Sequence, residues 1–147
     1  ELLERRGNKA FLSNTAIELG EAVIRQGRLE EAERFCKLGQ ELTASEDVEN
    51  EAGLALLRAR IQAARGDLVR AEEVARRAVE IASGTDSLER AADAWLTLAK
   101  ILRAKGDPGD KAAASAALAL YERKGNVVGA GWAQVFMEKA GASAGAQ

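Results

Sequence analysis

The sequence predicts an all-α protein, a right-handed α-solenoid in which antiparallel helix pairs repeat about three times before a capping helix. Charged residues make up 30% of the chain and aromatic residues only 4%, a composition typical of long helices. So few aromatic side chains could not fill the core of a β-sandwich. Glycines recur with a period of roughly 39 residues, at Gly27, Gly66 and Gly106. Another set of small residues keeps the same register, at Gly20, Ala59 and Ala99.

Each repeat has the same order of elements: a first helix, a glycine turn and a second helix. The first helices are expected over Leu12–Gln26, Val48–Arg65 and Leu88–Lys105. The second helices are expected over Leu29–Thr43, Leu68–Ala82 and Pro108–Lys124. Glycine at the turn supplies the positive φ that ends a helix. Aspartates stand at positions suited to begin the next helix, at Asp67, Asp86 and Asp107.

The repeat register also divides the chain. The segment Leu2–Asn8 matches Leu120–Asn126, so residues 1–10 are expected to be the tail of a preceding repeat helix and a linker, as in a fragment of a longer array. Residues 11–126 then form three helix hairpins, over 11–47, 48–86 and 87–126. Residues 127–140 are expected to form the capping helix and residues 141–147 a disordered tail.

Packing in such an array depends on the small residues, because one hairpin cannot bury its apolar face alone and must stack on the next. Gly20, Ala59 and Ala99 allow a neighbouring helix to approach closely. Larger side chains are expected to fill the layer between them, namely Leu19, Val23, Phe35, Leu42, Val74, Ile81, Leu98 and Leu102. Cys36, Trp95 and Trp132 are interpreted as further core residues.

These patterns resemble a known repeat family. The third unit reads Trp95-x2-Leu98-Ala99-x2-Leu102, which resembles the first-helix signature W-x2-L-G-x2-Y of the tetratricopeptide repeat. Gly27-x4-Ala32 and Gly66-x4-Ala71 are similar to the turn and second helix of that repeat. The period departs from the ~34 residues of the family. The second unit departs too, because Arg58 and Gln62 replace apolar signature positions.

A narrower resemblance concerns the parent protein. The phrases Gly27–Glu33 and Tyr121–Asn126 resemble the C-terminal repeats of large actinobacterial STAND-type signalling proteins. Such proteins carry a nucleotide-binding module and an adenylate or guanylate cyclase or LuxR-type output domain. The resemblance implies a protein–protein interaction or regulatory module of a bacterial signalling or transcriptional regulator. The alternative is a passive structural spacer or self-association scaffold, with a homodimer formed through exposed ends of the array.

The tetratricopeptide resemblance implies that the first helices line a concave, partner-binding face. The residues expected there are Asn14, Ile17, Glu21, Arg25, Leu56, Arg60, Asp93, Leu96, Lys100 and Arg103. Ile17, Leu56 and Leu96 occupy one equivalent position and would form an apolar stripe beside cations, which suits a peptide or partner domain with acidic residues. The alternative interpretation is that the stripe is core between repeats and the charges are a solvated face.

Composition argues against several other functions. The chain has no His and one Cys, so we expect no catalytic residues, no metal site, no cofactor and no enzyme activity. The formal net charge of −2 argues against nucleic acid as a partner. No apolar run approaches the ~20 residues of a membrane span, so we expect no membrane partner. A lone Cys cannot form an internal disulfide, which favours a cytoplasmic location.

Overall fold

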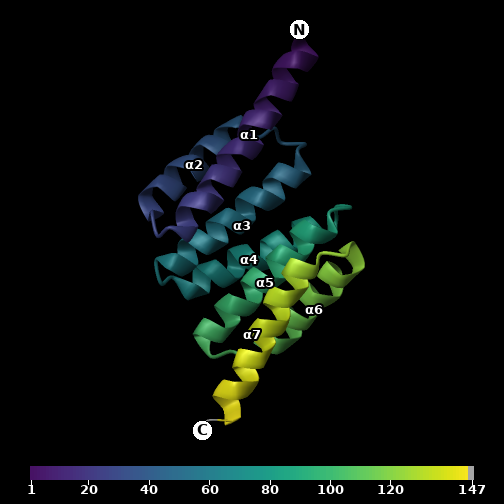
Figure 1. Cartoon of the computed structure of the whole chain (residues 1–147). Helices are drawn as coiled ribbons and strands as arrows, with labels where there is room; N and C mark the ends of the chain where they lie inside the picture. Colours follow the sequence, from purple (N-terminus) through teal and green to yellow (C-terminus); the bar gives the residue numbers. More distant parts are fainter. Residues whose placement is uncertain (146–147) are drawn as a thin grey trace.

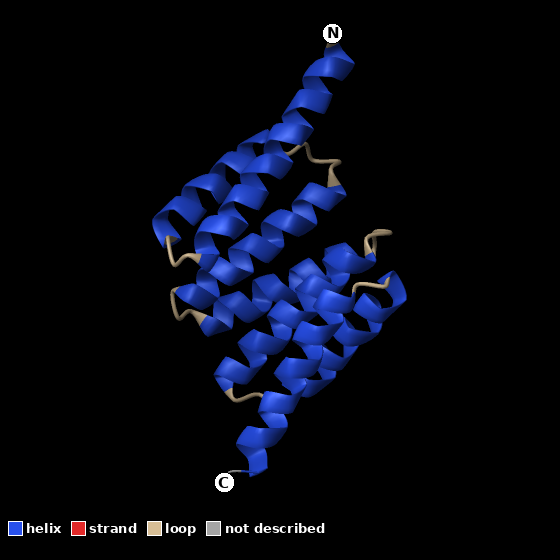
Figure 2. Cartoon of the chain, viewed as in Figure 1, coloured by secondary structure: helices blue, strands red, loops and turns tan. Residues whose placement is uncertain are grey.

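The computed structural model describes the backbone of residues 1–145 and the side chains of residues 1–139, and over this part of the chain it contains helices and no strands (Figure 2). The predicted all-α class is therefore confirmed. The helices are α1 Leu2–Arg25, α2 Leu29–Leu42, α3 Val48–Ala64, α4 Leu68–Ser83, α5 Leu88–Lys105, α6 Asp110–Lys124 and α7 Val127–Gly145. The pairs α1–α2, α3–α4 and α5–α6 follow one another along the molecule, α7 lies with α6 at the C-terminal end, and the N-terminal part of α1 projects away from the others (Figure 1).

The predicted glycine turns are confirmed. Gly27, Gly66 and Gly106 have φ values of 75°, 85° and 74°, in the left-handed region that favours glycine. The residue after each glycine donates a backbone hydrogen bond back into the helix, as Asp107 N does to Leu102 O at 2.9 Å. Gly125 ends α6 in the same way, with φ 77°. These tight ends turn the chain over a few residues, so each helix can pack on the one before it.

Side-chain caps start several helices, though not all at the predicted residues. Asp67 caps α4 as expected, because its carboxylate accepts from the backbone N of Arg70 at 3.2 Å. Ser87, rather than the predicted Asp86, caps α5. Helix α6 begins at Asp110 and not at Pro108, because Asp107 instead accepts from the backbone N of Gly109 at 2.8 Å and holds a turn there.

Both ends of the chain differ from the expected boundaries. Helix α1 runs unbroken from Leu2 past residue 10, where the sequence predicted a helix tail and a linker, because Gly7 does not adopt positive φ. The matching Gly125 does adopt positive φ, and the side chain of Asn126 after it accepts from the backbone N of Gly129 at 2.9 Å and starts α7 there. Helix α7 extends to Gly145, past the predicted end at 140, and residues 146–147 of the expected disordered tail lie outside the described residues.

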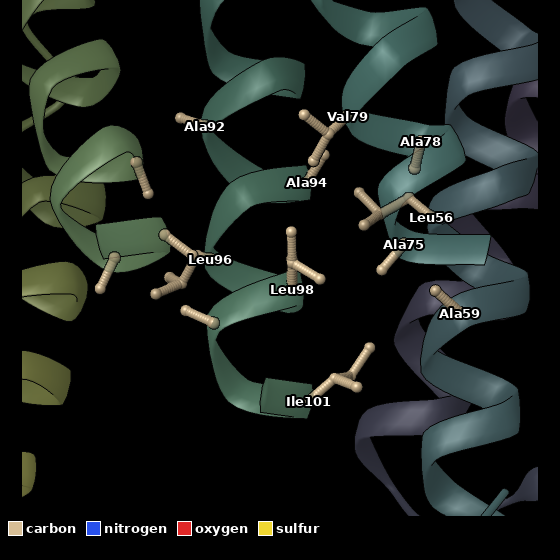
Figure 3. Close-up of a cluster of buried hydrophobic side chains, with 14 of the residues drawn as sticks. Leu56, Ala59, Ala75, Ala78, Val79, Ala92, Ala94, Leu96, Leu98 and Ile101 are labelled. Atoms are coloured by element: carbon tan, nitrogen blue, oxygen red, sulfur yellow. The ribbon is translucent and has the colours of Figure 1, made fainter. Parts of the chain in front are cut away.

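The core is built largely from alanine. Ala71, Ala75 and Ala78 of α4 are fully buried against α3 and α5, which brings these helices close together (Figure 3). From α5, Leu98 and Ile101 project toward α3 and α4, whereas Leu96 projects toward the side of α6 and α7 (Figure 3). The small residue Gly20 allows close packing of α1 and α3, because a Cβ there would lie 2.6 Å from Leu57 Cδ2 and the leucine would have to shift.

The predicted core residues divide into three groups. Val23, Leu98 and Leu102 are buried, as expected. Others are only partly buried, namely Phe35, Leu42, Val74, Ile81 and Trp95. Leu19 was predicted wrongly, because 44% of its surface is exposed. It lies next to Gly20 on α1, and one residue corresponds to about 100° around a helix, so the buried Gly20 turns Leu19 away from α2 and α3.

Helices of odd number form one layer of neighbours. Helix α1 contacts α3, and α3 contacts α5, in addition to the contacts of each helix with the next one along the chain. Arg103 of α5 also reaches Phe136 of α7. One side of the molecule therefore carries α1, α3, α5 and α7 in succession. None of the described helices has a stretch with the length and hydropathy needed to cross a bilayer.

Candidate functional site

An open cavity of about 810 Å³ lies along the odd-numbered helices, and we refer to it as the groove. Its wall comes mainly from α1, α3, α5 and α7, with single residues contributed by α4 and α6. The charged residues of its wall are Glu21, Arg25, Arg60, Asp93, Lys100 and Lys139. Its apolar residues include Ile24, Leu68, Leu96, Ile101, Trp132, Val135 and Phe136.

The structure brings together six of the ten residues predicted for the partner-binding face. These six line the groove, namely Glu21, Arg25, Arg60, Asp93, Leu96 and Lys100. The other four, Asn14, Ile17, Leu56 and Arg103, lie outside its lining. The first-helix register therefore identified much of the wall but assigned too many positions to it.

The apolar stripe predicted from Ile17, Leu56 and Leu96 is not an exposed surface. Ile17 and Leu56 are each only 2% exposed and belong to the packed core. The alternative interpretation, core between repeats, is the correct one for these two residues, because neighbouring odd helices meet at this position. Leu96 is also buried, at 5% exposure, but it borders the groove where α5 faces α7.

Asn14 and Arg103, predicted for the partner-binding face, make contacts within the fold. The Asn14 amide donates to the Glu18 carboxylate at 3.0 Å on the same helix. The Arg103 guanidinium donates to Asp110 at 3.1 Å and to the backbone O of Phe136 at 2.7 Å, and it stacks 3.2 Å from the centroid of the Phe136 ring. Arg103 therefore joins α5, α6 and α7.

An ion pair neutralises one end of the groove. Arg60 of α3 donates to the carboxylate of Glu21 on α1, and its Nε also donates to Thr97 Oγ1 of α5 at 3.3 Å. Both charged side chains are partly buried, so the pair links three successive odd helices. The contact fixes the guanidinium of Arg60 and leaves its charge largely compensated.

The rest of the groove carries an excess of positive charge. Four basic and two acidic side chains line it, in a chain whose formal net charge is −2. Among the described residues, Arg25, Lys100 and Lys139 make no ion pair. Lys100 is exposed, but the surrounding groove wall still removes part of its solvation, which lowers the pKa of its ammonium group. The like charge of Arg60 lowers this pKa further. An anion beside Lys100 would relieve this repulsion.

Asp93 is the second acidic residue of the groove wall, and a side chain of α6 holds it through a hydrogen bond. The buried phenol of Tyr121 donates a hydrogen bond to the Asp93 carboxylate. Burial, and then this hydrogen bond, raises the pKa of the Tyr121 phenol above its ordinary value of 10.0. Tyr121 therefore keeps its proton and orients one oxygen of the Asp93 carboxylate.

Helix α7 contributes four groove residues that the sequence analysis did not assign to the site, Trp132, Val135, Phe136 and Lys139. Each follows a groove residue of α5 by one 39-residue repeat, namely Asp93, Leu96, Thr97 and Lys100 in turn. Extending these four positions of the repeat to α7 would have found them. Trp132 was interpreted as core, but 58% of its surface is exposed because it lies at the open edge of the groove.

The groove combines exposed apolar surface with cations that form no ion pair within the described part of the chain. Such a wall can hold an apolar side chain and an anionic group at the same time. Scanning the sequence against protein-family models matches no family, and searching the curated proteins finds no match either. The geometry and charge of the groove therefore carry the functional argument.

Proposed function

We propose that this chain is a protein–protein interaction module, a tetratricopeptide-like array of antiparallel helix pairs that binds a peptide or partner domain in the groove. The observation that carries the proposal is the overlap of unpaired cations with exposed apolar side chains on one wall. Amphipathic segments with acidic residues are complementary to such a wall. A regulatory array of a larger bacterial signalling protein, working in the cytoplasm without catalysis, fits this role.

The register of the groove residues supports the repeat interpretation. Glu21, Arg60, Lys100 and Lys139 stand at one equivalent position of α1, α3, α5 and α7, with steps of about 39 residues. A right-handed stack of helix hairpins places equivalent residues in a row along one face. The same stack leaves its second helices, α2, α4 and α6, to cover the other side.

A bulky side chain placed in the groove tests the proposal, because it fills the groove without changing the charges of the groove wall. Ala104 of α5 lines the groove and is exposed, and Ala119 of α6 is exposed outside the groove lining. Peptides selected by display against the wild-type chain should lose roughly tenfold or more in affinity for Ala104→Trp and keep their affinity for Ala119→Trp. Equal binding to all three proteins would contradict a site in the groove.

Self-association is a second candidate function, favoured by a separate observation. The N-terminal part of α1 exposes large apolar side chains, with Leu3 at 84% and Phe11 at 70%. Apolar surface of this kind commonly marks an interaction site. Sedimentation equilibrium over a range of concentrations tests the candidate: a dimer that Phe11→Ser dissociates supports it, and a monomer throughout contradicts it.

A further inference from the structure

Helix α1 exposes large apolar side chains along one side, namely Phe11, Leu12 and Leu19, at 70%, 50% and 44% of their surface. In the repeat match between the two ends of the chain, Phe11 corresponds to Gly129 of α7. Gly129 lies against the Tyr121 ring of α6, since a Cβ there would be 2.4 Å from Tyr121 Cδ1. The repeat therefore buries this side of a helix under the preceding helix, and α1 is the first of the described helices.

Helix α7 exposes an apolar side of its own. Val128, Trp132 and Val135 are 62%, 58% and 49% exposed, and their intervals of four and three residues place them on one side of the helix. Of the twelve large apolar side chains that are exposed in the described part of the chain, nine belong to α1 or α7. Exposed apolar surface, which commonly marks an interaction site, is thus concentrated on the first and last helices.

The interior helices lack such a side because they have neighbours on both sides. Helix α3 contacts α1 and α2 before it and α4 and α5 after it, whereas α1 packs mainly on α2 and α3, and α7 mainly on α6. Figure 1 shows α1 and α7 at opposite ends of the series of helices. A pair of copies joined through two α1 helices leaves every α7 exposed. Contacts of α7 with α1, repeated along a row of copies, cover both kinds of apolar side.

We propose that copies of this chain associate head to tail, with the apolar side of α7 in one copy packed on the apolar side of α1 in the next. Trp132 and Val135 then lie against Phe11, Leu12 and Leu19 of the next copy. The inference rests on self-association, the second candidate function, and names its partner and its contact. Removal of these exposed side chains from water supplies the free energy of association.

Unlike charges accompany the two apolar sides. Lys139, which makes no ion pair with the described residues, follows Trp132 by seven residues on the same side of α7. The exposed Glu18 follows Leu12 by six residues beside the apolar side of α1. In the proposed array the odd-numbered helices run in one direction, and each rises about 1.5 Å per residue. With Trp132 beside Leu12 of the next copy, the Lys139 ammonium therefore comes close to the Glu18 carboxylate, which favours this pairing of ends.

The position of the two sides also sets the size of the assembly. A contact between two identical sides is complete in a dimer, whereas a contact between two different sides leaves one of each free in every dimer. Because α1 and α7 lie at opposite ends of the series of helices, the free sides accept further copies (Figure 1). The head-to-tail contact thus predicts a row of copies that lengthens with concentration.

Sedimentation velocity at rising concentration tests the contact, and the wild type should form species that grow past the dimer. Phe11→Glu blocks the α1 side and Val128→Glu the α7 side. Each should raise the dissociation constant roughly tenfold or more, because a carboxylate would be buried in an apolar contact. Val128 does not line the groove, so Val128→Glu should leave the affinity of display-selected peptides unchanged. Val69→Glu, at a 65% exposed position of α4, is the matched control and should associate like the wild type.

A mixture of the two blocked variants supplies the decisive comparison. Each variant keeps one intact side, so each should be monomeric alone, and an equimolar mixture should form a dimer and nothing larger. A mixture that stays monomeric would overturn this inference, as would either variant that associates alone like the wild type, because that result indicates a contact between two identical sides. Both results leave self-association standing. A wild type that is monomeric at every concentration would overturn the inference and the second candidate function together.

Discussion

The phenol of Tyr121 on α6 donates its hydrogen bond to the carboxylate of Asp93 on α5, which ties the outer helix to the wall of the groove. Tyr121 is fully buried, and its ring also occupies the space beside Gly129 of α7. One side chain thus fixes the relative position of three helices.

Tyr121→Phe should destabilise the fold by about 1.5–3 kcal/mol, because a hydrogen bond to a charged acceptor is lost while the ring is kept. Urea unfolding at neutral pH measures the change. An exposed substitution on the same helix, Ala119→Ser, serves as a control and should cost well under about 1 kcal/mol. A Tyr121→Phe variant as stable as the control would show that the hydrogen bond contributes little.

The raised pKa of Tyr121 predicts a specific pH dependence. In the unfolded chain a tyrosine loses its proton near pH 10, whereas the folded protein retains it. Unfolding therefore releases a proton above about pH 10, so this contribution to stability is present below that pH and is lost as the pH rises further. Tyr121 is the single tyrosine, so tyrosinate absorbance reports it directly, and titration of the folded protein at the ordinary pH would contradict the contact.

Gly129 is expected to be essential for the docking of α7. A Cβ at this position would lie 2.4 Å from Tyr121 Cδ1, against a ring that the core holds in place. Gly129→Ala should therefore destabilise the protein by about 1–3 kcal/mol in thermal unfolding. Gly131→Ala is the matched control on the same helix, where nothing lies within 4 Å, and it should be neutral or stabilising by up to about 1 kcal/mol. If Gly131→Ala destabilised the protein more than Gly129→Ala, α7 would not pack on Tyr121 through Gly129.

Gly7 and Gly125 occupy matching sequence segments but should respond to alanine in opposite ways. Gly7 lies inside α1 with open space around it, so Gly7→Ala should raise helix content by stabilising that turn by roughly 0.5–1 kcal/mol. Gly125 has φ 77°, so Gly125→Ala should destabilise the protein by about 1–2 kcal/mol. Circular dichroism and thermal unfolding measure both effects. A loss of helix in Gly7→Ala would indicate a turn at residue 7.

Arg103→Lys should loosen α7 while keeping the charge. A lysine cannot maintain both the contact with Asp110 and the contact with the Phe136 carbonyl, nor stack its head group flat on the ring. Amide hydrogen exchange should therefore become faster in α7 and change little in α2. Arg123→Lys, at an exposed position of α6, is the control. Unchanged exchange in α7 would show that other contacts hold this helix.

Local chemistry explains what the sequence predicted correctly. The turns at Gly27, Gly66 and Gly106 were predictable because positive φ is a property of one residue and its nearest backbone. The burial of Ala59 and Ala99 followed from repeat spacing, since equivalent small residues meet equivalent neighbours. Helix ends were less predictable, because Asp86 and Ser87 are adjacent residues of types that both cap helices, and the structure uses Ser87.

The groove was predictable only in part because it depends on tertiary packing. Ile17 and Lys100 both lie on first helices, but a few tens of degrees around the helix separate the side that meets the next odd helix from the side that meets solvent. Arg103 looked like a binding cation until Asp110 and Phe136 supplied its partners. Trp132 was interpreted as core because the sequence does not show how α7 lies against α5, and that packing decides the exposure of its side chain.

The central claim is that α1, α3, α5 and α7 form the binding wall, and amide chemical-shift mapping with a display-selected peptide tests it most directly. The account predicts that the largest shifts occur at groove residues on these four helices, strongest around Lys100 and Val135. Exposed residues of α2 and α4, such as Lys37 and Arg76, should not shift. Shifts concentrated on α2, α4 and α6, with the groove unperturbed, would contradict the claim.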